Sequence, residues 1–373
     1  MPLREHRVLD AAAPGALIRA LQRRDYRVLG PTVRDAAIVL DELHSAADLP
    51  VSWSDAQAPG IYRIVPQEHQ AYFAYGNGPH SWKKYLHPPQ STLFTAEREN
   101  CGFRILEPEP RDQRAMAFLG VHACDLAAIA RLEQALTAGG DAGCAARRQR
   151  TFLVAIQCLH AGGACFCAAM QAGPRVADGY DLVIAELHGP PHHFLAAAGS
   201  ERGAEVLAEL ESAAAGPGDL RELEQGIARA AQEQARKLDS AASHELLARV
   251  FDDAHWDKIA ARCLGCGNCT SVCPTCFCTT VEDGSDVTGK HATRCRHWDS
   301  CFNPDFSYIH GGSIRASLRA RYRQWMSHKL GAWIDQFGAH GCVGCGRCLT
   351  WCPVGIDLTE EFHALQEASH GNS

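Results

Sequence analysis

The chain has 373 residues, of which 46% are hydrophobic and 21% are charged, and its formal net charge is −7. Such a chain is expected to form two or three folded domains, and its composition excludes disorder and collagen-like repeats. The negative charge argues against a protein that binds nucleic acid through bulk charge. Eighteen cysteines are the unusual feature, because a chain of this length does not need disulfide staples.

The sequence shows neither a targeting signal nor a membrane span. The N-terminus carries charges throughout and lacks the apolar run of a secretory signal, and Arg23-Arg24 is followed by Asp25 rather than by an apolar run. No window approaches the roughly 18 uncharged apolar residues of a membrane span. We therefore expect a cytoplasmic protein, in which clustered cysteines are more often metal ligands than disulfides.

Strand-like runs alternate with helical stretches along residues 1–199. The helical pattern at 125–136 ends before Gly139-Gly140, which is a plausible stop signal. This alternation predicts an α+β or α/β N-terminal domain. The expected strands are 61–65, 115–121, 151–156 and 181–185.

Two changes in composition divide the rest of the chain. From residue 200 the sequence is rich in Ala, Glu, Gln, Arg and Leu, which predicts a helical connector over 200–254. Beyond it cysteines crowd together and β-branched runs disappear. We therefore expect a separate domain at 255–373.

The pattern C-x2-C-x2-C-x3-C-P occurs twice in this last segment, from Cys263 to Pro274 and from Cys342 to Pro353. Three cysteines spaced by two residues can wrap three corners of a [4Fe–4S] cluster, and in two-cluster proteins the fourth cysteine binds the other cluster. Glycines between the cysteines let the backbone approach the cluster closely. The pattern assigns Cys263, Cys266, Cys269 and Cys352 to cluster 1, and Cys342, Cys345, Cys348 and Cys273 to cluster 2.

Zinc is the alternative metal for these eight cysteines. Structural zinc favours two CxxC pairs separated by a longer loop, without the repeated four-cysteine run and its proline. The 68 residues between Cys273 and Cys342 are far more than a small β-rich ferredoxin needs, and they show little strand pattern. We therefore predict an all-α domain that holds two clusters.

Four further cysteines lie in the N-terminal domain. Cys158, Cys165 and Cys167 follow one strand-like run, and Cys124 begins the helix after another. The hypothesis is that these four hold a third [4Fe–4S] cluster. The alternative is that they are buried, inert thiols.

The remaining six cysteines fall into two sets. The first set either forms a further metal site or simply packs beside cluster 2, and the sequence does not decide between the two. This set comprises Cys276, Cys278 and Cys301. The second set has no patterned partner and is expected to be ordinary thiols; it comprises Cys101, Cys144 and Cys295.

Several common site patterns are missing. The 19 histidines, among them His192 and His193 in a Pro/Gly loop, lie in no HExxH or Rieske-like pattern, so we expect solvated or core histidines. There is no phosphate-binding or dinucleotide-binding glycine motif and no nucleophile elbow. We therefore assign no catalytic residue and expect a non-catalytic subunit that passes electrons between partners.

These motifs resemble a known family. Residues 263–278, 298–301 and 342–353 are similar to the beta subunits of cytoplasmic sulfhydrogenases, which are NADP-linked [NiFe] hydrogenases that also reduce sulfur. The same family includes an electron-transfer subunit of anaerobic sulfite reductase. Residues 122–126 and 158–167 are similar to its N-terminal motifs, although His122-Ala123 stands where the family often has Arg-Pro.

The resemblance implies an iron–sulfur electron-transfer subunit with an α-helical ferredoxin domain. The partners that it implies are the small and large subunits of a [NiFe] hydrogenase, together with a flavin and NAD(P)-binding gamma subunit. The nearest alternative is the electron-transfer subunit of an anaerobic sulfite reductase. An alternative from another class is a zinc-stabilised interaction protein.

Overall fold

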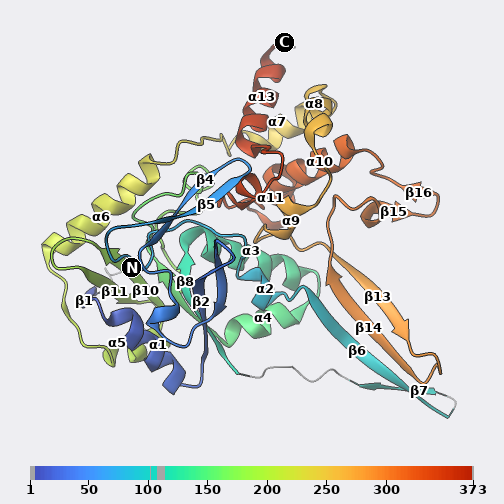
Figure 1. The fold of residues 1–373 in the computed structure, drawn as a ribbon. Helices are drawn as coiled ribbons and strands as arrows, with labels where there is room; N and C mark the ends of the chain where they lie inside the picture. Colours follow the sequence, from blue (N-terminus) through green and yellow to red (C-terminus); the bar gives the residue numbers. More distant parts are fainter. Residues whose placement is uncertain (1–4, 101, 107–113, 372–373) are drawn as a thin grey trace.

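The computed structural model describes residues 5–100, 102–106 and 114–371. Figure 1 shows a large sheet flanked by helices, a group of C-terminal helices above it, and a narrow sheet that projects away from both. Among the described residues, none of the helices has the length and apolar character needed to cross a membrane.

The large sheet has eight strands in the order β12-β1-β11-β10-β9-β8-β2-β3. Its central pairs are parallel and its outer pairs are antiparallel. Both β9 and β10 are buried along their whole length, which explains their continuous apolar sequences. The strands are β1 (Arg7–Leu9), β2 (Arg27–Arg34), β3 (Ala37–Glu42), β8 (Met116–His122), β9 (Thr151–Ile156), β10 (Leu182–Leu187), β11 (His193–Ala198) and β12 (Ala213–Ala214).

Helices cover both faces of this sheet. On one face α1 (Ala13–Arg23) and α5 (Glu201–Ala208) bury apolar side chains against β8 and β9. On the other face α3 (Ala123–Ala138) and α4 (Ala142–Gln149) do the same. The prediction of a mixed α and β N-terminal region is therefore confirmed.

The predicted strands and helix of this region are also present. The runs at 115–121, 151–156 and 181–185 correspond to β8, β9 and β10, and the predicted helix lies within α3. The run at 61–65 is a strand outside the large sheet, because β5 (Ile61–Pro66) pairs with β4 (Trp53–Ala58) in a separate two-stranded sheet.

The segment 200–254 contains α5, α6 (Pro217–Gln232) and α7 (Ser243–Arg249). The first part of this segment packs with the large sheet. Strand β12 pairs with β1, and α6 buries Leu223 and Ile227 beside β10 and β11.

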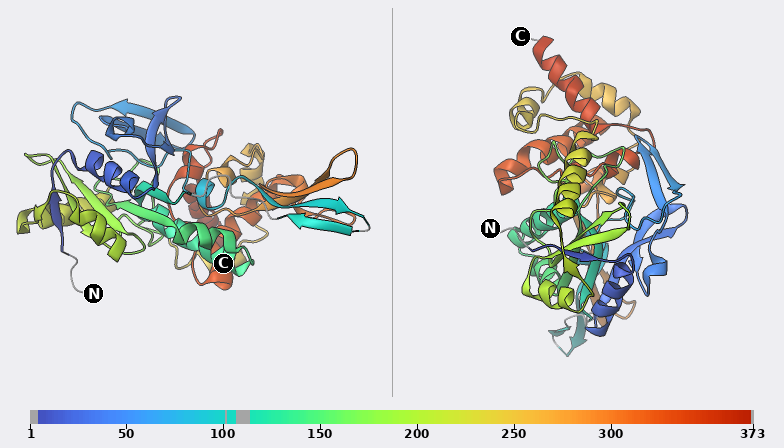
Figure 2. Two further views of the ribbon diagram at one scale, coloured as in Figure 1. Left: turned by 90° about the horizontal axis from the view of Figure 1, so that it is seen from below. Right: turned by 90° about the vertical axis from the view of Figure 1, so that its left-hand side faces the viewer.

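The projecting sheet corrects the expectation of an all-α C-terminal domain. Its strands are antiparallel and follow the order β13-β14-β6-β7 (Figure 2, left). Because β14 pairs with β6, the sheet joins two segments that are far apart in the chain. The polar sequence of β13 leaves most of its side chains exposed, so no apolar alternation marked it as a strand. The strands are β6 (Gln90–Glu99), β7 (Gly102–Leu106), β13 (Thr279–Ser285) and β14 (His291–Trp298).

The other C-terminal elements are mainly helical, apart from the short hairpin of β15 (Tyr308–Ile309) and β16 (Gly312–Ser313). Their core includes Trp256, Trp325 and Phe362 and also takes in Phe166 from the N-terminal half. The two halves therefore share one core. The helices are α8 (His255–Arg262), α9 (Asn268–Ser271), α10 (Leu318–Ser327), α11 (Trp333–Phe337), α12 (Arg347–Thr350) and α13 (Leu358–Gly371).

Candidate iron–sulfur sites

The two cysteine runs fold into the same local structure. Each forms a loop that enters a one-turn helix, α9 in the first run and α12 in the second. The residue before each helix is a left-handed glycine, Gly267 at φ 73° and Gly346 at φ 77°. A side chain at either position would be strained, which explains why both runs have glycine there.

The first thiol group comprises Cys263, Cys266, Cys269 and Cys352. Burial and the nearby thiols of Cys263 and Cys352 raise the pKa of Cys269 well above its ordinary value. Backbone amides point at the sulfurs: Gly265 N–H donates to Cys263 Sγ over 3.4 Å, and Ile356 N–H donates to Cys352 Sγ over 3.3 Å. Cys352 thus lies beside the first run although it ends the second.

The second thiol group comprises Cys273, Cys342, Cys345 and Cys348. Burial and the thiols of Cys342, Cys345 and Cys273 raise the pKa of Cys348 well above its ordinary value. The N–H of Gly344 donates to Cys342 Sγ over 3.4 Å. The structure therefore brings the last cysteine of each run to the other run, which is the arrangement that crossed ligation needs.

A buried lysine accompanies the second thiol group. Lys329 Nζ donates to Thr275 Oγ1 over 2.6 Å, and Thr275 Oγ1 lies 3.3 Å from Cys273 Sγ. Burial alone disfavours this ammonium ion, but the thiols of Cys273 and Cys276 raise the pKa of Lys329 above its ordinary value. A positive charge held here offsets the negative charge of thiolates. No motif in the sequence marked Lys329.

The third thiol group comprises Cys124, Cys158, Cys165 and Cys167, and all four line one cavity. Burial raises the pKa of Cys158, Cys165 and Cys167 to about 12 each, and neighbouring thiols contribute. Side-chain amides face two sulfurs. Asn77 Nδ2 lies 3.5 Å from Cys124 Sγ, and Gln234 Nε2 lies 3.3 Å from Cys167 Sγ.

The three thiol groups adjoin one another in series. The thiol of Cys269 in the first group contributes to the raised pKa of Cys348 in the second. The thiol of Cys345 in the second group likewise contributes to the raised pKa of Cys124 and Cys165 in the third. The loops of the last two groups touch, because Phe166 N–H donates to the Gly344 carbonyl over 2.9 Å.

The other cysteines differ in their surroundings. Cys276 contacts Cys273, and a hydrogen bond from the Cys301 thiol lowers the pKa of Cys278 to about 7. Cys276 therefore lies beside the second group, whereas Cys301 lies near Cys278 and near Cys269 of the first group. Cys144 is buried against the large sheet, Cys295 is half-buried on β14, and Cys101 lies outside the described residues.

The donor atoms fit iron–sulfur clusters. Each group offers four thiols, a cubane needs one thiolate for each of its four irons, and N–H···S contacts of the kind seen here accompany such clusters. A buried thiolate without a positive partner is unfavourable, and the raised pKa values of these thiols reflect this cost. A bound metal centre would remove this penalty.

Comparison with known proteins supports iron–sulfur binding in the C-terminal part of the chain. A family model described as a 4Fe-4S dicluster domain matches residues 262–356. The chain is 28% identical over 345 residues to "Sulfhydrogenase 2 subunit beta" of Pyrococcus furiosus. The alignment covers 91% of this chain and 92% of that protein. No solved structure matches the chain. The resemblance to a hydrogenase beta subunit is therefore confirmed, as is the presence of a 4Fe–4S dicluster domain.

Proposed function

We propose that this chain relays electrons between a [NiFe] hydrogenase of the sulfhydrogenase type and a flavin and NAD(P)-binding subunit in the cytoplasm. The observation that carries the proposal is the series of three adjoining thiol groups in one shared core. The similarity to a sulfhydrogenase beta subunit over most of both chains supports it. In this function the chain has no catalytic residue of its own.

The first and second thiol groups would each hold one [4Fe–4S] cluster, and the third group would hold another. When bound, such clusters supply one-electron redox chemistry over a wide range of potentials. The polypeptide supplies the cysteine ligands, the amide donors to sulfur and a buried ammonium group at Lys329. These donors and this charge stabilise the reduced, more negative state.

The shared core also shields part of the thiol groups from water, although Cys266 of the first group is exposed. Trp256 and Phe362 are fully buried there, and the thiols of Cys342 and Cys345 are buried with them. A low dielectric around the thiols strengthens every charge interaction in the core, including that of Lys329.

The proposal is tested on the native complex, purified without oxygen. We expect nickel in the complex. In the full chain separated from its partners, also without oxygen, we expect about twelve iron atoms and twelve sulfides, four for each cluster. Cys165→Ala is expected to reduce both counts to about eight, whereas the control Cys295→Ala leaves them unchanged. A count near eight in the native protein would remove the third cluster from the proposal.

Three other outcomes would overturn the partner assignment or the relay function. Siroheme and sulfite-dependent NADH oxidation without nickel would identify the sulfite reductase alternative. A colourless, zinc-containing protein would identify the interaction protein. Full hydrogen-to-NADP activity in Cys263→Ser and Cys345→Ser proteins that have lost their clusters would exclude an electron relay.

A further inference from the structure

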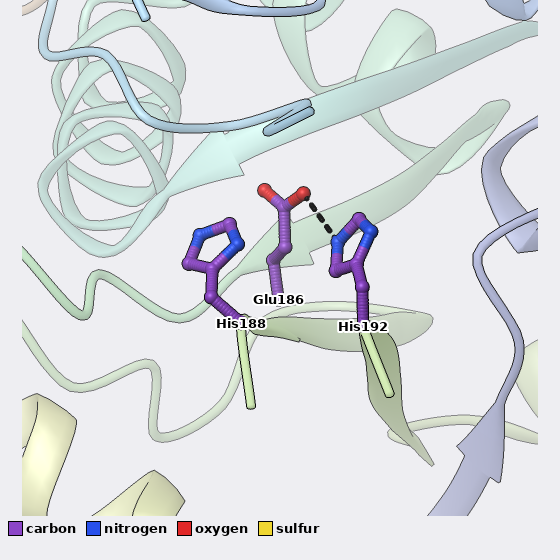
Figure 3. Close-up of side chains that lie close together, drawn as sticks. All are labelled: Glu186, His188 and His192. Atoms are coloured by element: carbon purple, nitrogen blue, oxygen red, sulfur yellow. Dashed lines mark hydrogen bonds and ion pairs between the residues drawn. The ribbon is translucent and has the colours of Figure 1, made fainter. Parts of the chain in front are cut away.

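A second group of metal-binding side chains lies at the end of β10, outside the thiol groups. Figure 3 shows His188 and His192 on either side of Glu186, with all three side chains converging. One ligand atom from each residue lies within 4.8 Å of the others. We propose that Glu186, His188 and His192 bind one divalent transition-metal ion of the zinc class.

The carboxylate is held in position by the backbone. Glu186 is only 5% exposed, and its Oε1 accepts a hydrogen bond from Tyr72 N–H over 2.8 Å. Its Oε2 accepts one from Phe73 N–H over 2.9 Å. A ligand whose orientation is fixed by such outer contacts loses little freedom when it binds a metal.

Both imidazoles are suited to metal binding. His192 Nε2 lies 2.9 Å from Glu186 Oε1, so the two ligand atoms already face each other. Imidazole nitrogens are common ligands for metal ions of this class.

The arrangement is more than an ion pair. A pair of Glu186 and His192 would not need His188, whose ring stacks on His192 with 5.4 Å between centroids. Among the residues that the structure describes, no hydrogen bond occupies the ring nitrogens of His188. Two imidazoles and one carboxylate form a known donor set for Zn²⁺ and related ions, with a fourth position left for water or another ligand.

The site is accessible and chemically distinct from the thiol groups. His188 is exposed, which provides an entry path from solvent. Glu186 and His188 line the same cavity as Cys158 and Cys165, but nitrogen and oxygen ligands differ from thiolates in their metal preference.

The test uses the anaerobic, cluster-containing complex after a chelator wash, with Zn²⁺ alone as the probe. We expect one tightly bound zinc per chain, with only nitrogen and oxygen neighbours at roughly 2.0–2.2 Å in its X-ray absorption spectrum. His188→Ala keeps the Glu186–His192 pair and the carboxylate's backbone contacts. It should weaken zinc binding by about 100-fold or more, since even outer contacts contribute 10–100-fold.

The matched control is His310→Ala, which removes an exposed histidine from the β15–β16 hairpin. It should bind zinc like the native protein, and iron and sulfide contents should be unchanged in both variants. Equal zinc affinity in the His188→Ala and native proteins would overturn the proposal. Zinc bound only to sulfur, at about 2.3 Å, would also overturn it. Neither result depends on the electron-relay function, which has its own iron count.

Discussion

Arg347 and Asp125 form a buried ion pair with two contacts, at 2.8 Å and 3.2 Å, and each side chain is 3% exposed. Asp125 follows Cys124 at the start of α3, and Arg347 precedes Cys348 in α12. Burial lowers the pKa of Arg347, but the Asp125 carboxylate and the Cys345 thiol outweigh this effect and raise the pKa above its ordinary value. This pair therefore joins the third thiol group to the second.

Removing one partner of this pair should destabilise the protein strongly. Asp125→Ala leaves a buried guanidinium without its counter-charge, which typically costs about 3–5 kcal/mol of unfolding free energy. Urea unfolding of the anaerobic protein measures the loss. The double variant Asp125→Leu/Arg347→Met should recover most of it, because apolar side chains can replace a buried pair.

An exposed pair provides the control for that experiment. Asp283 and Arg294 interact on the projecting sheet, at 2.6 Å between carboxylate and guanidinium, with both side chains largely in solvent. Solvent screens such pairs, so Asp283→Asn should leave the urea midpoint unchanged. Equal effects of Asp125→Ala and Asp283→Asn would contradict the structural role of the buried pair.

The close approach of two loops predicts the effect of a methyl group at Gly344. A Cβ there would lie 2.5 Å from the Phe166 carbonyl oxygen, and the residue has φ +64°. Gly289 has the same φ, but a Cβ would meet nothing within 4 Å. Gly289→Ala thus tests the backbone strain alone, which we expect to cost about 1–2 kcal/mol.

Gly344→Ala adds a steric clash to the same backbone strain. It should therefore lower the free energy of unfolding more than Gly289→Ala does, and it should push the loops of the second and third thiol groups apart. We expect lower iron content in Gly344→Ala and native iron content in Gly289→Ala. Equal iron content and equal stability in the two variants would show that the loops do not need their close contact.

His87 makes stability depend on pH. Its side chain is fully buried, and burial, with Arg296 and Lys83 nearby, lowers its pKa to about 4. In the unfolded chain the pKa is about 6.5, so below that pH the unfolded state binds the extra proton. The stabilising contribution is complete above pH 6.5 and is lost as the pH falls toward 4.

His87→Leu removes this proton uptake. Between pH 7 and pH 5 the native protein should lose about 2 kcal/mol more unfolding free energy than the variant. Urea unfolding at both pH values measures the difference, and the shared acid sensitivity of other groups cancels between the two proteins. Parallel pH profiles would contradict a neutral, buried His87.

Asn77 should tune the third site if that site holds a cluster. Its Nδ2 lies 3.5 Å from Cys124 Sγ and donates to the Cys345 carbonyl over 3.1 Å. Hydrogen bonds to cluster sulfurs stabilise the reduced state, so Asn77→Ala should lower the midpoint potential of this site without loss of iron. Redox titration followed by electron paramagnetic resonance measures the shift, with Asn303→Ala as the distant control.

Local sequence determined a large part of this protein. The spacing of the eight C-terminal cysteines and their glycines predicted two cluster loops, because such loops depend on neighbouring residues and on backbone freedom. The apolar runs of β8, β9 and β10 and the helix α3 were predicted for the same reason, since their periodicity is local.

Only the tertiary structure decided which distant segments of the chain contact one another. The polar strand β13 takes its place in a sheet through β14, which pairs with β6 from the other half of the chain. Asp125 and Arg347 are 222 residues apart, and Glu186 meets the backbone of Tyr72 across 114 residues. Burial and contact of this kind depend on the packing of the whole chain, which no single motif records.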